Sequence, residues 1–270
     1  MTKQNQQQTH HLNIAGEYRQ DWVNGIKEQD YKALLTKIET ISPSNILDLC
    51  GGTGELTKRL QDKRYDVTLS DYDLKLLSVS KEKGIEKTIK LDVLNEEFPS
   101  GLDMIVMKSA EHEFQPNNLS IIHKKIYDAL NEGGKYITWD VYPETKAQAE
   151  WVLEYVRTKD TIAGDMHLAR NRYIYSEDEC INKLEIMGFK NIQIVHRFYY
   201  NIQNSRLAQA YFSDMNGVVD LNKKEDLYKL TTDLINKYED IFSMKSLIIH
   251  DKENRDYFIK IPALIVIGEK

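Results

Sequence analysis

Apolar residues along this chain alternate between two patterns. Short runs without helical spacing predict buried strands, at 46–49, 66–71, 88–93, 102–109 and 135–140. Segments with apolar residues at helical spacing predict a helix before the first strand, at 29–40. Further helices are predicted between the strands, after residue 55, from about residue 73 and at 118–130. Strands that alternate with helices predict an α/β fold around a mostly parallel sheet.

After residue 143 the alternation is less regular. The expected elements are a helix at 146–155, an irregular or hairpin segment at 161–175, a helix at 177–187, a strand at 191–200, a helix at 223–242 and a strand at 257–267. Gly133 and Gly134 are expected to end the helix at 118–130, as Gly188 ends the one at 177–187. We expect one domain, 12–270, with helical cap insertions at about 143–175 and 204–250.

The first residues differ in composition from the rest. Residues 1–11 are polar and rich in Gln, which predicts a disordered tail. In the segment 14–27, Tyr18, Trp22 and Ile26 recur at helical spacing and predict an amphipathic helix. Packing of this helix on the core is one interpretation, and closure over a ligand pocket is the other.

The first predicted strand leads into a loop rich in glycine. Gly51, Gly52 and Gly54 lack the Cβ atoms that would keep a ligand away from the backbone, and glycine tolerates positive φ. The loop lacks the G-x-x-x-x-G-K-[ST] pattern of phosphate loops, and it has only two of the three glycines in G-x-G-x-x-G. Asp48 precedes the glycines, where it would repel a pyrophosphate. We expect a ligand that is cationic or rich in hydroxyl and amine groups, unless the loop is a turn that binds nothing.

Two further acids follow the next two strands. Asp71 ends the second strand, where a carboxylate can accept hydrogen bonds from the vicinal hydroxyls of a ribose. Capping of the helix that begins near Asp73 is the other interpretation of Asp71. Asp92 ends the third strand, so three successive strands end in an acid, and this repetition is the strongest functional signal in the sequence.

The segment Asp48-Leu-Cys-Gly-Gly-Thr-Gly54 resembles the first motif of class I S-adenosylmethionine-dependent methyltransferases, most closely the ubiquinone and menaquinone branch. Cys50 stands where the family usually has glycine. The resemblance implies a Rossmann-like sheet of seven strands, mostly parallel, with helices on both faces and the last strand antiparallel. It also implies S-adenosylmethionine as cofactor and S-adenosylhomocysteine as product.

The resemblance assigns roles residue by residue. Asp71 would bind the ribose, Tyr72 would pack on the adenine, and Asp92 and Val93 would contact the adenine ring. The full set of implied cofactor-binding residues is Tyr18, Arg19, Asp48, Cys50, Gly51, Gly52, Gly54, Asp71, Tyr72, Asp92, Val93, Lys108 and Ser109.

Polar side chains after the fourth strand are the first place to look for catalytic groups. His112 is the leading general base, because a neutral imidazole titrates near working pH. Its competitors are Glu111, Glu113, Asp140, Tyr142 and His167. The other interpretation is that His112 orients the substrate or caps the next helix. The expected substrate contacts are Trp22, His112, Tyr142, His167 and Tyr173. We expect no metal site, because the His-Glu sequence here cannot complete a coordination shell alone.

The net charge and the number of cysteines argue against several classes of partner. The net charge of −6 and pI near 5.7 give no global positive field for nucleic acid. Two cysteines cannot build a disulfide framework, and no apolar run approaches membrane-spanning length. We therefore expect a cytoplasmic monomer or homodimer that acts on a small molecule, without nucleic-acid or membrane partners.

The expected reaction is methyl transfer from S-adenosylmethionine to an O, N or C nucleophile by in-line displacement. The sequence has no [ND]-P-P-[YFW] string, which argues against methyltransferases of adenine amino groups and glutamine amides. It has no Pro-Cys or Thr-Cys nucleophile, which argues against those of cytosine C5. Two alternatives remain. One is an enzyme of this fold that uses the cofactor for other chemistry, and the other is a degenerate binding protein.

Overall fold

The computed structural model describes residues 26–214, 216–239 and 247–270, in two compact units. The sheet unit comprises Glu28–Val141, Glu177–Phe198 and Ala263–Lys270, and the insertion unit includes Tyr142–Ser176 and Tyr199–Pro262. Both predicted insertions lie within the insertion unit, while the single-domain organisation stays a prediction. The predicted tail and most of the predicted N-terminal helix, with Tyr18, Arg19 and Trp22, lie outside the described residues.

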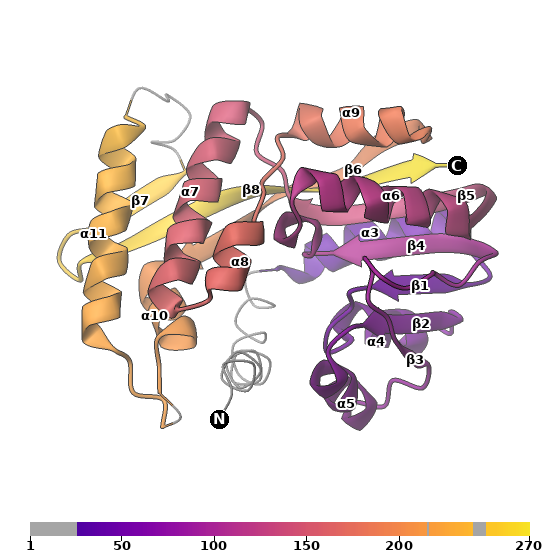
Figure 1. Cartoon of the computed structure of the whole chain (residues 1–270), viewed down its shortest axis with the longest axis horizontal. Coiled ribbons are helices and arrows are strands. Elements are labelled where there is room, and N and C mark those ends of the chain that lie inside the picture. The colour runs from indigo at the N-terminus through magenta and orange to yellow at the C-terminus, as the bar shows by residue number, and fades with distance from the viewer. Residues whose placement is uncertain (1–25, 215, 240–246) are drawn as a thin grey trace. The chain divides into compact units, whose positions relative to one another are not determined.

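Within the described ranges the strands form one sheet of eight, with the order β3-β2-β1-β4-β5-β8-β6 and with β7 paired to β8 (Figure 1). The strands are β1 (Ile46–Leu49), β2 (Val67–Asp71), β3 (Thr88–Lys90), β4 (Leu102–Lys108), β5 (Leu130–Val141), β6 (Lys190–Gln203), β7 (Ile248–Asp251) and β8 (Asp256–Glu269). β1 pairs in parallel with both β2 and β4, and β8 runs antiparallel to β5. The Rossmann-like α/β prediction is confirmed, and β7 is an additional strand that the sequence did not indicate.

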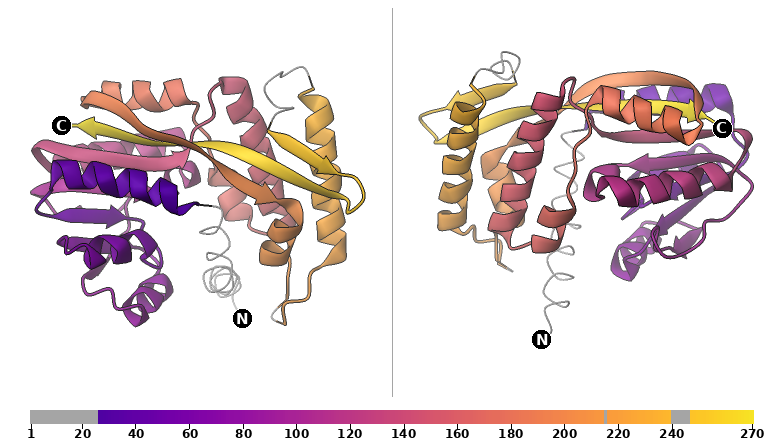
Figure 2. Two further views of the ribbon diagram at one scale, coloured as in Figure 1. Left: turned by 180° about the vertical axis from the view of Figure 1, so that it is seen from behind. Right: turned by 45° about the horizontal axis from the view of Figure 1, so that its top comes forward.

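The helices of the sheet unit follow the strands in alternation. They are α3 (Glu28–Ile41), α4 (Glu55–Asp62), α5 (Leu74–Glu82), the 3₁₀ turn η2 (Glu111–Glu113), α6 (Pro116–Ala129) and α9 (Glu177–Met187). Figures 1 and 2 show α3 on one face of the sheet and α6 on the other. All four residues of β1 are buried between these layers, as the apolar Ile46, Leu47 and Leu49 predict. The carboxyl end of β1 is therefore held rigidly at the centre of the sheet.

The junction of α6 and β5 corrects one prediction. The helix ends at Ala129, before the two glycines that were expected to end it. Gly133 and Gly134 instead lie within β5, where the partner of Leu102 is Leu130 but the partner of Met104 is Lys135. The extra residues form an irregularity in the strand pairing, and Gly133 supplies its positive φ of 77°.

The insertion unit is more helical than predicted. Its helices are α7 (Lys146–Ala163), α8 (Met166–Asn171), α10 (Asn204–Tyr211) and α11 (Leu221–Lys237). The prediction of an irregular or hairpin segment at 161–175 was wrong. Gly164 ends α7 with a φ of 90°, and the Asp165 side chain caps α8 by accepting the Leu168 N–H. A short helix with such a strong turn signal before it is easily mistaken for a loop.

No helix in the described ranges combines the length and the hydropathy that crossing a membrane requires.

The β5 irregularity gives a test of backbone crowding. A Cβ on Gly134 would lie 2.8 Å from the carbonyl oxygen of Asn131, whereas one on Gly133 would meet nothing within 4 Å. We expect Gly134→Ala to lower the free energy of unfolding by about 3 kcal/mol through overpacking. Gly133→Ala should cost about 1–2 kcal/mol, from its left-handed backbone alone. Urea denaturation of both variants checks the order, which an equal or smaller loss in Gly134→Ala would contradict.

Candidate functional site

The glycine loop turns sharply between β1 and α4. Cys50, Gly52 and Gly54 have positive φ values of 57°, 59° and 78°. A Cβ on Gly54 would lie 2.9 Å from Leu69 Cδ1, so the side chain of any other residue would crowd the core. A non-glycine residue in the left-handed region costs about 1–2 kcal/mol, which Cys50 bears where the resembling motif has glycine. The loop is therefore a strained turn with its backbone close to the sheet.

Asp48 lies under this loop with its side chain fully enclosed. It is 1% exposed, and its Oδ2 accepts a hydrogen bond of 2.6 Å from Thr57 Oγ1 on α4. Burial raises the pKa of Asp48 to about 6, although Thr57 and Lys108 act in the opposite direction. Its Oδ1 has no hydrogen-bond partner among the described residues. The site thus holds a buried carboxylate oxygen that remains able to accept a hydrogen bond.

Asp71 fixes the loop from the neighbouring strand. Its Oδ2 accepts the Gly52 N–H at 2.9 Å and its Oδ1 accepts the Asp73 N–H at 2.9 Å. Asp73, and not Asp71, is the N-cap of α5, because its side chain accepts the Lys75 N–H. The capping interpretation of Asp71 is therefore wrong. Each carboxylate oxygen has two lone pairs, so Asp71 can accept further hydrogen bonds from a ligand.

The other implied cofactor residues follow β2, β3 and β4. Tyr72 is 63% exposed next to Asp71, and Val93 is buried. Asp92 accepts hydrogen bonds from the backbone of Leu94 and from both nitrogens of Asn95, which hold its pKa below the usual value. This turn keeps the Asp92 carboxylate ionised.

Lys108 and Ser109 lie where β4 leaves the sheet. The Lys108 ammonium stands 5.8 Å from the ring centre of Tyr31 and 5.5 Å from that of Trp139. Ser109 has a positive φ of 55° and donates its N–H to the carbonyl of Trp139. A positive charge beside Asp48 thus sits against two buried aromatic rings. Helical spacing placed Tyr31 on α3 but did not indicate its contact with Lys108, because α3 is distant along the chain.

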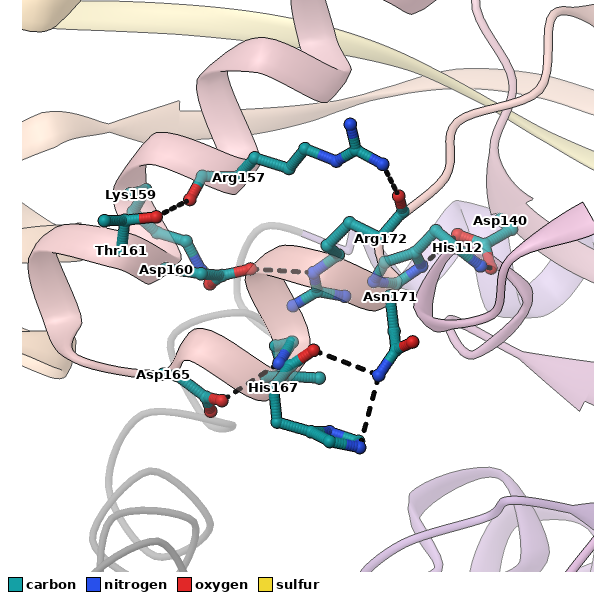
Figure 3. Close-up of polar contacts among 11 residues, drawn as sticks. His112, Asp140, Arg157, Lys159, Asp160, Thr161, Asp165, His167, Asn171 and Arg172 are labelled. Carbon is teal, nitrogen blue, oxygen red and sulfur yellow. Dashed lines mark hydrogen bonds and ion pairs between the residues drawn. The ribbon is translucent and has the colours of Figure 1, made fainter.

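His112 and Asp140 form a hydrogen-bonded pair (Figure 3). His112 Nδ1 lies 2.6 Å from Asp140 Oδ1, and the His112 N–H donates to Asp140 Oδ2 at 3.2 Å. Asp140 is 1% exposed, whereas the His112 side chain is 20% exposed. An ionised Asp140 favours the proton on Nδ1, which leaves Nε2 as the proton acceptor. The pair has the arrangement of a base and the group that orients it.

Glu111 points away from solvent. It is 2% exposed, and its Oε1 lies 2.8 Å from His123 Nε2 and accepts a hydrogen bond from the Tyr136 hydroxyl. This carboxylate is bound to both α6 and β5, and a part for Glu111 in catalysis stays a prediction. Among the described residues, no group of three or more His, Cys, Asp or Glu is arranged to hold a metal ion.

Three of the expected substrate residues belong to the insertion unit. Tyr142 is buried, and His167 is exposed on α8 with its Nε2 3.2 Å from Asn171 Nδ2 (Figure 3). The ring centres of Tyr173 and Tyr175 lie 4.5 Å apart. Their part in substrate binding stays a prediction.

The sequence did not single out a buried ionic cluster in the insertion unit. Asp160 on α7 is fully buried and pairs with Lys159 at 2.5 Å and with Arg172 Nε at 2.9 Å (Figure 3). These two cations keep the pKa of Asp160 below its usual value against the opposing effect of burial. Because Lys159 and Asp160 are neighbours on a helix, no spacing rule pointed to the cluster.

This chain is similar in sequence and in fold to known proteins. Residues 46–134 match the model of the methyltransferase domain family. A curated relative, an uncharacterized methyltransferase of Staphylococcus carnosus (strain TM300), is 24% identical over an alignment of 175 residues that covers 62% of this chain and 79% of the relative.

Two solved structures share the fold. The YcgJ protein from Bacillus subtilis matches with a TM-score of 0.68 at 17% identity, over 89% of this chain and 98% of that one. A candidate methyltransferase from Bacillus halodurans C-125 matches with a TM-score of 0.64 at 18% identity, over 84% and 92%. At these identities the likeness shows the fold alone.

The buried carboxylate of Asp48 makes stability depend on pH. Its folded pKa of about 6 lies above the ordinary 3.8, so the folded state binds the proton more tightly and loses stability as pH rises from about 4 to 6. We expect Asp48→Asn to remove this decline and to raise the free energy of unfolding at pH 7 by up to about 3 kcal/mol. Urea denaturation between pH 4 and 8 measures it. Parallel curves for the variant and the wild type would refute the assignment.

Proposed function

Because this chain is a class I S-adenosylmethionine-dependent methyltransferase, we propose that it transfers the methyl group to a small-molecule acceptor. The acceptor atom is an O, N or C nucleophile, and the transfer is an in-line displacement. The observation that carries the proposal is the structure of the loop between Asp48 and Gly54. This loop is a strained turn next to the enclosed carboxylate of Asp48, and the Gly52 N–H donates a hydrogen bond to Asp71.

The residues of the site fit this cofactor. A Cβ on Gly51 would lie 2.8 Å from the Asp48 carboxylate, so only glycine leaves room there. The open lone pair of Asp48 Oδ1 suits a cationic amine, and Asp71 suits the ribose hydroxyls. The proposed cofactor contacts are Asp48, Cys50, Gly51, Gly52, Gly54, Asp71, Tyr72, Asp92, Val93, Lys108 and Ser109, with Tyr18 and Arg19 from the N-terminal segment.

Positioning supplies most of the catalysis. When bound, S-adenosylmethionine supplies a methyl group that its sulfonium already activates. Correct orientation of the acceptor can lower the barrier by about 7–11 kcal/mol, whereas a general base contributes about 3–5 kcal/mol. The role of His112 is then to take the acceptor's proton at Nε2, while Asp140 holds the ring through Nδ1.

The residues that would contact the acceptor are proposed from their side-chain types. The proposed acceptor contacts are Trp22, Tyr142, His167 and Tyr173, whose aromatic and imidazole side chains are of the types that suit a small, partly apolar molecule. The acidic net charge of −6 supports an acceptor other than nucleic acid. Neither Cys50 nor Cys180, both among the described residues, takes part in a disulfide, which supports a reducing, cytoplasmic setting.

Cofactor binding tests the first half of the proposal. We expect isothermal titration with S-adenosylmethionine and S-adenosylhomocysteine to show micromolar affinity, and Asp71→Ala to weaken it by at least about 100-fold through lost charged hydrogen bonds. Asp66→Ala is the matched control, because Asp66 precedes the other end of β2 and pairs at the surface with Lys87. Equal affinities for the two variants would contradict the role of Asp71, and no binding by the wild type would overturn the proposed function.

Transfer itself requires an acceptor screen. We expect a product heavier by one CH₂ group, detected by mass spectrometry in incubations of the wild type with S-adenosylmethionine and pooled small molecules. With the acceptor found, His112→Gln should lower kcat by about 10²- to 10⁴-fold and leave cofactor affinity unchanged. His250→Gln, at an exposed histidine of β7, is the control. An unchanged kcat in His112→Gln would remove the base from the mechanism, and a product of other mass would favour non-methyl chemistry.

A further inference from the structure

The turn that carries His112 is attached to β5 at three points. Its entry is held where Ser109 donates to the carbonyl of Trp139 at 2.7 Å. Its middle is held where His112 meets Asp140. The third attachment is the Glu111 carboxylate, which accepts from Tyr136 on the same strand.

Tyr136 and Asp140 face the same side of β5, because side chains alternate along a strand and the two positions differ by four. Each holds one of two adjacent residues of η2. Glu111 is also joined to α6, since its Oε1 lies 2.8 Å from His123 Nε2. The rings of His123 and Tyr136 meet edge to face with their centres 5.6 Å apart, so the donors themselves are packed together.

The cluster of Glu111, His123 and Tyr136 is sealed from solvent. The three side chains are 2%, 3% and 0% exposed. Burial and the adjacent Glu111 carboxylate raise the pKa of Tyr136 well above its usual value, which keeps its hydroxyl a donor. A buried carboxylate is strongly attached to its donors, since their loss would leave it without hydrogen bonds in an apolar site.

From this geometry we propose that Glu111 is a positioning residue, and that Tyr136 and His123 set the orientation of His112 through it. The proposal rests on the proposed function, because it assigns His112 the role of proton acceptor. Glu111 fixes the backbone of η2 so that His112 Nδ1–H meets Asp140 and Nε2 remains unprotonated. Glu111 contacts no substrate, and it acts through the next residue in the chain.

The tautomer of His112 is the direct readout, and it requires no acceptor. In the ¹⁵N-labelled full chain, long-range ¹H–¹⁵N spectra distinguish Nδ1–H from Nε2–H. We expect wild-type His112 to be mainly Nδ1–H, and Tyr136→Phe to lower the ratio of the two tautomers by roughly tenfold, the effect of one buried hydrogen bond. Glu111→Gln keeps an acceptor oxygen of the same shape and should retain the wild-type ratio. Tyr127→Phe, on α6 with its ring against Phe189, is the matched control.

A second variant provides the same test if Tyr136→Phe does not fold. His123→Leu removes the other donor with similar volume and should shift the tautomer in the same direction. An unchanged His112 spectrum in folded Tyr136→Phe or folded His123→Leu would overturn the proposal. So would an equal change in Tyr127→Phe. Titration of the same samples with S-adenosylmethionine separates the two hypotheses, because absent binding by the wild type counts against the proposed function and leaves the tautomer result to stand.

Discussion

The hydrogen bond from the Gly52 N–H to Asp71 Oδ2 is the contact on which the site depends. It joins the loop after β1 to the end of β2, two strands that already pair in parallel at Leu49 and Ser70. The loop can then keep left-handed φ values at Cys50, Gly52 and Gly54 in spite of their cost. Without this tie, the strain in the turn would be free to relax away from the sheet.

The order of the strands explains why the charged groups of the site come together. β1 has β2 on one side and β4 on the other, and their carboxyl ends share one edge of the sheet. Asp48, Asp71 and Lys108 stand at these ends, with His112 just beyond β4. Ligands of open α/β sheets bind at this edge, where strand order reverses direction. The order β2-β1-β4 makes such a reversal next to β1.

The sequence predicted those parts of the molecule whose signals are local. The central strands are short segments dominated by apolar residues, and Asp48 and Asp71 could be assigned to strand ends from their neighbours alone. Contacts between distant elements gave no such signal. The hydrogen bond between Thr57 and Asp48 and the enclosure of Glu111 by α6 and β5 depend on tertiary packing. The short helix α8 depends on a cap whose sequence resembles that of a turn. Glu111 looked catalytic because its type and position were right, and only the fold shows that it is buried.

The enclosed carboxylate of Asp48, with its raised pKa, also couples ligand association to proton release. A cationic group held against Asp48 stabilises its charged form, so association near pH 6 expels whatever proton the carboxyl carries. The measured heat of association would then include the ionisation heat of the buffer that accepts this proton. The affinity for a cationic ligand would strengthen as pH rises through about 6, while a neutral ligand of equal size would show no such change.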